Sequence, residues 1–373
     1  NKDEKAYVSW LEKAAAAHPQ ALQPRVALAR YLLAKGDKNQ ALAVAREAVN
    51  TNPDSPAALD LLGTTQLMLG DTTNALGSYR KLAEHQPGQA APLVKIATVQ
   101  ITARDFTGAR KTLQDALRIQ PDFLEAQLLL GDVEIQGARF DEAHKIARQV
   151  QLQRADNPAG YSLEGNIALA RKDYPAALAA FERAHKLQPS GTLLVRQFQV
   201  LTASRRTEEG EKRLATWLAT HPQDVATRAA LAESLLKRGQ YKAAVEHYLI
   251  LNKSNPGNLL VVNNLAWALH ESGDSRALAF AEQALKLKPD NPAVLDTLGW
   301  ILVQQGHSER GLKLLLQAPD SAEIHFHLAS AYAKTGDRTR AKNELERLLA
   351  SGMAFPQEPE ARAMLKQLQA ASR

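Results

Sequence analysis

The residues best suited to hold a ligand lie in the C-terminal third of the sequence. Trp267 and Trp300 carry amphipathic rings that can stack on a peptide side chain or on a sugar. Asn263, Asn264 and His270 accompany Trp267 at spacings that place the four side chains on one stripe of a helix. Their polar groups can hydrogen-bond to a peptide backbone or to hydroxyls. The candidate binding residues are Asn263, Asn264, Trp267, His270, Asp296, Thr297, Trp300, Phe326 and His327.

The other chemistry-bearing residues form no catalytic or metal-binding pattern. His325 and His327 are two positions apart, so on a helix they point about 200° away from each other and cannot share a metal ion. Carboxylates such as Asp132 and Glu233 lie in separate parts of the sequence, and no nucleotide-binding or H-E-x-x-H motif occurs. The sequence contains no cysteine, which excludes disulfides and thiolate chemistry. We therefore expect no enzymatic activity, no metal and no cofactor.

A regular series of turn residues determines where the helices must lie. The intervals are 34 residues in the first five steps and then 33, 34, 33 and 30. Prolines such as Pro53, Pro87 and Pro121 follow seventeen residues after a turn. Two stop signals per period predict two helices per period, and thus an α-solenoid. The predicted turn residues are Gly36, Gly70, Arg104, Ala138, Lys172, Arg206, Gly239, Gly273, Gly306 and Gly336.

Small residues recur at one position of the first helix, seven residues before each turn. Nine of the ten are alanine or glycine, and Gln199 is the exception. An alanine often follows five residues after the turn, as at Ala41 and Ala177, and a bulky residue such as Tyr79 or Phe181 stands four residues further on. Because packed interiors leave no room for extra methylenes, this pattern predicts two helices in close contact with a large side chain beside the contact.

The pattern resembles the tetratricopeptide repeat, most clearly at residues 56–88 and 259–290. The resemblance covers essentially the whole chain. It implies an all-α, right-handed α-solenoid of about ten helical hairpins, with an extra N-terminal helix and a C-terminal capping helix. We assign residues 1–21 to the second helix of a preceding repeat, 22–191 to repeats 1–5, 192–224 to a degenerate repeat 6, 225–355 to repeats 7–10 and 356–373 to the capping helix.

Two copies depart from the pattern. Around Gln199, Arg205, Arg206 and Gly210 the sixth copy loses its small residue, its turn glycine and its alanine, so we interpret it as a loosened joint. The copy that begins near Asn291 is short, and its second helix is expected to end near Ala318. The last helix is expected at 358–370, where it would cover the apolar side of the final hairpin.

The resemblance also suggests which face binds, because in tetratricopeptide arrays the first helices line the concave surface. The candidate residues would then meet a protein or peptide segment, or a polysaccharide, on that surface. The alternative interpretation is that Trp267 and Trp300 fill space between neighbouring first helices. Trp10 and Trp217 are expected on second helices, where packing is the simpler explanation.

A more specific resemblance lies in residues 263–306 and 324–349, which are similar to the C-terminal part of lipoproteins of the PEP-CTERM/exosortase system. This implies a periplasmic location, with a lipid anchor upstream of Asn1, and a scaffold role in exopolysaccharide secretion or PEP-CTERM protein sorting. Two alternatives stay open. One is a carbohydrate-binding module that contacts the secreted polymer, and the other is a cytoplasmic adaptor or the repeat arm of a larger enzyme.

Charge and hydropathy narrow the choice of partner. The formal net charge of +6 is a mild excess for 373 residues, and no run of five or six basic residues occurs. The pair Arg205 and Arg206 is followed at once by Glu208 and Glu209, as on a solvated surface. We therefore expect no nucleic-acid binding. No apolar stretch approaches the roughly 20 residues of a membrane span, so any membrane contact would depend on the upstream lipid.

Overall fold

The computed structural model describes residues 2–18, 20–318, 321–353, 355 and 357–370. Every regular element within these residues is a helix, and the chain divides into two compact units, Asn1–Arg205 and Arg206–Arg373. The first unit begins with α1 (Lys2–Ala17) and the last helix of the second unit is α22 (Glu358–Ala370). The division falls inside the sixth copy of the repeat.

The helices between α1 and α22 alternate between the two roles that the turns predict. The first helices are α2 (Leu22–Lys35), α4 (Pro56–Met68), α6 (Ala91–Thr102), α8 (Leu124–Gln136), α10 (Ala159–Ala170), α12 (Gly191–Ala203), α14 (Val225–Lys237), α16 (Leu259–Glu271), α18 (Pro292–Gln304) and α20 (Ala322–Lys334). The second helices are α3 (Lys38–Thr51), α5 (Thr72–His85), α7 (Phe106–Ile119), α9 (Phe140–Gln153), α11 (Tyr174–Leu187), α13 (Thr207–Thr220), α15 (Tyr241–Ser254), α17 (Ala277–Leu287), α19 (Ser308–Leu315) and α21 (Arg338–Ala350).

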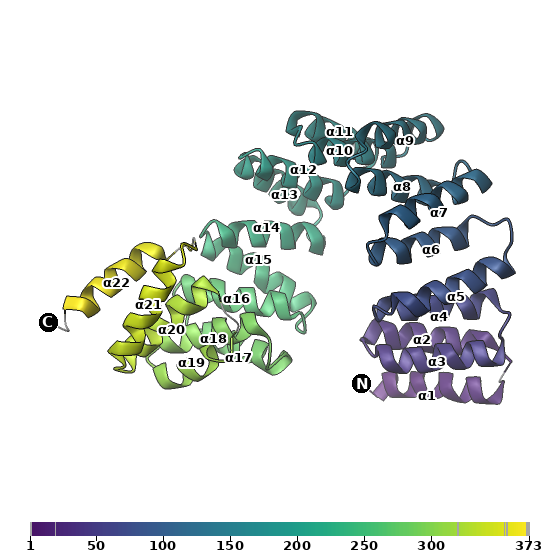
Figure 1. Ribbon diagram of the computed structural model, residues 1–373. Coiled ribbons are helices and arrows are strands. Elements are labelled where there is room, and N and C mark those ends of the chain that lie inside the picture. Colours follow the sequence, from purple (N-terminus) through teal and green to yellow (C-terminus); the bar gives the residue numbers. More distant parts are fainter. Residues whose placement is uncertain (1, 19, 319–320, 354, 356, 371–373) are drawn as a thin grey trace. The chain divides into compact units, whose positions relative to one another are not determined.

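Within each unit the packing is local. Each helix packs on the next one along the chain. Some first helices also contact the next first helix, for example α6 with α8 and α16 with α18. Figure 1 shows these helical hairpins following one another from α2 to α11 and from α14 to α21. Contacts between sequence neighbours alone define an α-solenoid, so the predicted fold class is confirmed.

The hairpin turns have a left-handed residue followed by a helix cap. Gly36 has φ 85°, and Asp37 then caps α3 by accepting a hydrogen bond from the backbone N–H of Gln40 at 3.3 Å. Arg104, Ala138 and Lys172 adopt the same left-handed conformation without being glycine, with φ of 60°, 54° and 60°. The predicted stand-ins for glycine therefore occupy the turn at a conformational cost.

In the sixth copy the predicted turn residue is wrong by one position. Arg205 is left-handed, with φ 63°, whereas Arg206 is the N-cap of α13. This copy is one residue shorter before its turn, so counting in steps of 34 overshoots. The position seven residues before the turn is therefore Phe198 and not Gln199, so this copy still lacks a small residue there. Gly210, five residues after the turn, is buried, so the returning helix keeps a small residue there.

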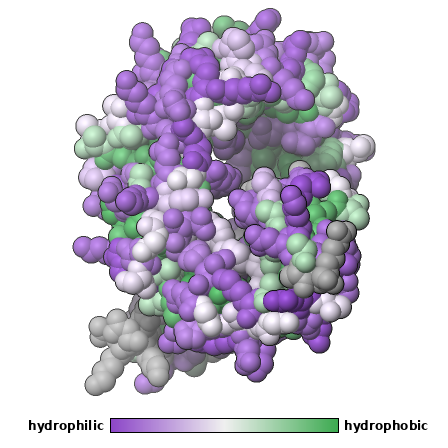
Figure 2. All heavy atoms as spheres, turned by 90° about the vertical axis from the view of Figure 1, so that its left-hand side faces the viewer, coloured by the Kyte–Doolittle hydropathy of each residue, from purple (hydrophilic) through white to green (hydrophobic). Residues whose placement is uncertain are grey.

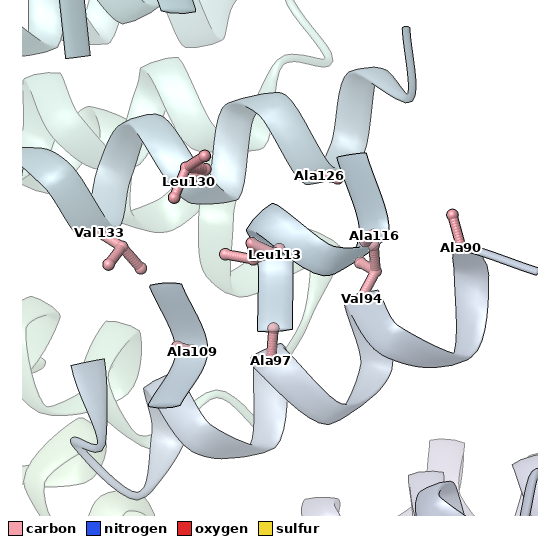
Figure 3. Packing of buried hydrophobic residues seen from close by; sticks show 9 residues of the cluster. All are labelled: Ala90, Val94, Ala97, Ala109, Leu113, Ala116, Ala126, Leu130 and Val133. Atoms are coloured by element: carbon pink, nitrogen blue, oxygen red, sulfur yellow. The ribbon is translucent and has the colours of Figure 1, made fainter. Parts of the chain in front are cut away.

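The core between hairpins repeats the small-against-large pattern. Leu113 of α7 is fully buried and lies between Ala97 of α6 and Leu130 of α8 (Figure 3). Tyr79, Phe181 and Tyr248 are buried at the equivalent place in their own hairpins. A Cβ added at Gly165 would lie 2.7 Å from Cε1 of Phe181, so this hairpin leaves no room for even a methyl group.

The C-terminal end follows the predicted departures. α19 has only eight residues and ends at Leu315, close to the expected end near Ala318. The capping helix α22 packs Met364, Leu365 and Leu368 against the core of the last hairpin. Its bounds are those expected for the last helix at 358–370, whereas residues 356 and 371–373 of the segment assigned to it lie outside the described residues.

Figure 2 shows the hydropathy of the residues over one face. Hydrophilic residues dominate this face, with hydrophobic residues scattered among them. No helix within the described residues is both long and apolar enough to cross a membrane.

Candidate binding groove

One position of the first helix lies directly after the small contact residue and therefore points away from the second helix. In the second unit this position holds Glu233, Trp267, Trp300 and Ser330 on successive first helices. Three of these residues, Trp267, Trp300 and Ser330, line a groove of about 620 Å³. The remaining lining residues are Tyr241, Glu271, Gln304, Phe326, Ala333, Lys334, Gln357, Glu360, Met364 and Gln367.

The aromatic side of the groove is a connected set of rings from α16, α18 and α20. The rings of Trp300 and His327 stack with centroids 4.1 Å apart and planes 20° apart. The ring centroids of Phe326 and Trp300 lie 5.8 Å apart, and those of Trp267 and His327 lie 6.4 Å apart. These contacts hold the tryptophans in place before any ligand arrives, which lowers the entropic cost of binding.

His327 is the buried residue behind the tryptophans. Its side chain is 2% exposed, and its Nδ1–H donates to Oδ1 of Asp296 at 2.6 Å. Nε2 of His327 is buried and has no hydrogen-bond partner among the described residues. Asp296 thus orients the imidazole ring, and the ring in turn supports Trp300. His325, two residues away, bonds instead to Glu344 at 2.8 Å, and the described residues hold no cluster of three or more potential metal ligands.

The polar rim combines two carboxylates with one amine. Glu271 ends α16 and Glu360 belongs to α22, and both are exposed. The ammonium of Lys334 donates to the carbonyl oxygen of Val303 at 3.1 Å and to Oε1 of Gln304 at 3.0 Å. Burial lowers the pKa of Lys334. The ammonium of Lys334 is therefore held by hydrogen bonds within the protein, whereas Glu271 and Glu360 place carboxylates at the rim of the groove.

Tyr241 completes the rim from α15. Burial is the main cause that raises the pKa of its phenol, and the neighbouring Glu271 carboxylate adds to the rise. The phenol is thus neutral at physiological pH, and its hydroxyl donates a hydrogen bond to the Glu271 carboxylate. Its aromatic ring adds a further apolar surface to the groove.

The predicted site residues divide into three groups. Trp267, Trp300 and Phe326 line the groove. Asp296, His327 and His270 do not line it, but they support the tryptophans, since His270 lies 6.1 Å from Trp267 between ring centroids. Asn263 and Thr297 are buried within the solenoid, and Nδ2 of Asn264 donates to the hydroxyl of Tyr248 at 3.2 Å. The structure does not bring these last three residues to the groove.

Several groove residues were missed by the sequence reasoning. Ser330 could have been identified from the repeat pattern, because it directly follows the small contact residue of its first helix, as Trp267 and Trp300 do. The end of each first helix would have identified Glu271, Gln304 and Lys334, which are equivalent in successive repeats. No local signal marks Gln357, Glu360, Met364 and Gln367, which reach the groove because α22 folds back against α20 and α21.

The other two tryptophans lie outside this groove. Trp10 is 65% exposed, so the expectation that it packs in the core is wrong. It lies next to Leu11 on α1, and it is Leu11 that turns toward the core. Trp217 stacks on His221 with centroids 3.6 Å apart, and its Nε1–H donates to Oδ2 of Asp224 at 2.8 Å.

The first unit presents a different chemistry at the same register. Thr64, Thr98, Asp132 and Asn166 occupy the position of the two tryptophans on successive first helices. Burial raises the pKa of Asp132, although nearby Arg196 and a hydrogen bond with Asn166 oppose the rise. This row is polar throughout, with hydroxyl, carboxyl and amide groups and no aromatic ring.

Comparison with known families agrees with this architecture. Models described as "Tetratricopeptide repeat" match residues 26–90, 100–167, 229–292 and 322–351, which together make up more than half of the chain. The chain is a tetratricopeptide repeat protein. Such repeats bind peptide or protein partners.

Three curated relatives share part of the chain. A TPR repeat-containing protein of Pseudomonas aeruginosa is 27% identical over 230 residues, covering 58% of this chain and 33% of that protein. The Vi polysaccharide export protein VexE of Salmonella typhi is 24% identical, and the match covers 60% of this chain and 36% of that protein. Cellulose synthase operon protein C of Pseudomonas fluorescens is 26% identical, covering 52% and 14%. The chain spans about a third or less of the length of these relatives.

Solved tetratricopeptide structures overlap with about half of the chain. YrrB, described as a TPR protein with an unusual peptide-binding site, has 18% identity and a TM-score of 0.38, covering 52% of this chain and 97% of that one. A TPR protein of Thermus thermophilus has 26% identity and a TM-score of 0.42, covering 49% and 100%.

Proposed function

We propose that the protein is a non-catalytic scaffold that holds a segment of a partner protein in the groove between α16, α18, α20 and α22. The observation that carries the proposal is the pair Trp267 and Trp300, whose rings line an open groove and are held from behind by His327. Buried aromatic anchors with a polar rim are the usual centre of a protein interface.

We further propose that the scaffold serves an envelope system for exopolysaccharide secretion or PEP-CTERM protein sorting. Two of the curated relatives are named for polysaccharide export and for a cellulose synthase operon, which supports the first of these settings. The similarity of residues 263–306 and 324–349 to PEP-CTERM/exosortase lipoproteins supports the second and a periplasmic location with a lipid anchor. Fractionation of cells that express the full-length gene tests the location.

The scaffold role is tested by capture of partners from an envelope extract. The immobilised protein is compared with its Trp267→Ala/Trp300→Ala variant and with Trp10→Ala as a matched control, because Trp10 is exposed on a different unit. We expect a defined protein to be retained by the parent and by the control and to be lost from the double variant. Equal retention by all three proteins, with circular dichroism confirming that each is folded, contradicts the role of the groove.

A second candidate function is direct binding of a carbohydrate. The row Thr64, Thr98, Asp132 and Asn166 supports it, because hydroxyl, carboxyl and amide groups at a regular spacing suit hydrogen bonding to sugar hydroxyls. Calorimetric titration of the protein with acidic and neutral oligosaccharides distinguishes the scaffold function from carbohydrate binding. Saturable heat that disappears in Asp132→Ala/Asn166→Ala would move the assignment to a carbohydrate-binding module.

A further inference from the structure

The charge of the groove selects among possible peptide ligands. Of the lining residues, Glu271 and Glu360 are acidic and Lys334 is basic. Lys334 keeps its charge while it donates to the neutral oxygens of Val303 and Gln304, so the two carboxylates and one ammonium among the lining residues leave one net negative charge. The field in the groove is therefore negative, and it attracts a cation and disfavours an acidic ligand.

The aromatic residues add a preference for a flat cation. A guanidinium group is planar and weakly hydrated, so it stacks on the face of an indole better than a compact ammonium does. Trp300 is suited to this contact because it is already aligned by its stack on His327. The guanidinium can also form paired hydrogen bonds to a carboxylate, which both rim glutamates offer.

The shape of the groove fits a short piece of extended chain. Its volume of about 620 Å³ is within the range of sites that enclose a small ligand. Gln304, Gln357 and Gln367 line it with amide groups, which can pair with peptide N–H and C=O groups. Oε1 of Gln357 is buried without a hydrogen-bond partner among the described residues.

We propose that the groove binds an extended peptide segment through an arginine side chain, whose guanidinium stacks on Trp267 and Trp300 and pairs with Glu271 and Glu360. This inference rests on the proposed scaffold function and names the ligand chemistry of the same groove. The capping helix α22 is then part of the binding site, because it supplies Glu360 as well as the cover of the last hairpin, and Gln357 directly precedes it.

Calorimetric titration of the whole protein with matched peptides tests the proposal. The probes are acetyl-Ala-Gly-Xaa-Gly-Ala-amide, in which Xaa is arginine, lysine, glutamate or citrulline. Citrulline keeps the shape of arginine and removes its charge. We expect the arginine peptide to bind at least tenfold more tightly than the citrulline peptide, the lysine peptide to be intermediate, and the glutamate peptide to bind most weakly. Equal affinity for the arginine and citrulline peptides overturns the proposal.

Two protein variants locate the effect. Glu271→Gln/Glu360→Gln keeps the shape of the rim, and we expect it to reduce the ratio of arginine to citrulline affinity to about one. Glu346→Gln is the matched control, because Glu346 is a glutamate on α21 that pairs with Lys342 outside the groove. An unchanged ratio in the double variant, with an unchanged unfolding midpoint, refutes the role of the carboxylates.

The experiment also separates this proposal from the proposed function. If the peptides do not discriminate but the envelope partner still depends on Trp267 and Trp300, the scaffold function stands and the arginine preference is wrong. If no peptide binds and the partner is retained by the Trp267→Ala/Trp300→Ala variant, both are wrong. A neutral oligosaccharide that competes with the arginine peptide for the groove overturns the peptide assignment.

Discussion

Adding one methyl group at Gly165 is expected to destabilise the fifth hairpin, although alanine is the better helix former. Gly165 lies on α10, and the ideal position of its Cβ is 2.7 Å from Cε1 and 2.8 Å from Cδ1 of Phe181. The ring of Phe181 is fully buried, so it has no free space to move into. Overpacking of this kind costs about 1–3 kcal/mol.

The net change combines this cost with a gain in helix propensity. Replacing glycine by alanine inside a helix contributes about 1 kcal/mol of stability. Because Phe181 is held on all sides, we place the overpacking at the upper end of its range, which leaves a net loss of about 1–2 kcal/mol for Gly165→Ala. Gly77 of α5 provides the matched control, since no atom lies within 4 Å of its added Cβ. Gly77→Ala is expected to show the propensity gain alone.

Native-state hydrogen exchange measured by mass spectrometry reports on each hairpin separately. In the Gly165→Ala protein, amides of α10 and α11 are expected to exchange about 5- to 30-fold faster, whereas Gly77→Ala slows exchange in α5. The Gly165→Ala/Phe181→Leu protein should recover part of the loss, because Ala97 and Leu113 form the equivalent pair in the third hairpin. Exchange in Gly165→Ala as slow as in the parent, or strictly additive effects in the double variant, would refute this packing argument.

Three further predictions concern other parts of the chain. Lys172→Gly removes a left-handed non-glycine residue and is expected to raise the free energy of unfolding by about 0.5–1 kcal/mol in urea titrations; a lowered midpoint would show that φ 60° carries no cost there. Burial lowers the pKa of His270, so the neutral imidazole is favoured in the fold and its contribution to stability is lost as pH falls below about 6.5. Quenching of Trp267 fluorescence should report this titration, with a midpoint below that of free histidine, and should vanish in His270→Gln. The loosened-joint hypothesis predicts that dilute trypsin cleaves the chain first after Arg205 or Arg206, where the two units divide. Earlier cleavage at another site would contradict the hypothesis.

The arrangement of hairpins was predictable because solenoid contacts are local. A glycine and an alanine at set distances are enough to define a turn and a close contact, and both act within one repeat. The bounds of α22 and the early end of α19 followed from the same local signals. The error at Arg206 arose because a one-residue deletion in the sixth copy leaves no trace in a simple count, while backbone geometry locates the turn at Arg205.

The composition of the groove depended more on tertiary structure. The helical stripe included Trp267 and Trp300, which line the groove, but it also included Asn263, which is buried, and Asn264, which is bonded to Tyr248. Adjacent residues on a helix differ by about 100° in direction, so a stripe drawn too wide includes side chains that face the interior. The exposed Trp10 was misjudged for the same reason, because its neighbour Leu11 occupies the core position.

By itself, the sequence determined that the protein is a chain of helical hairpins and that aromatic residues recur at one position of two consecutive repeats. Only the tertiary structure decided that His327 and Asp296 support those rings from behind and that α22 supplies a carboxylate to the rim. The physical reason is distance along the chain. Periodicity reports contacts within a repeat, whereas the groove is formed where side chains from three first helices, from the start of α15 and from the capping helix come together.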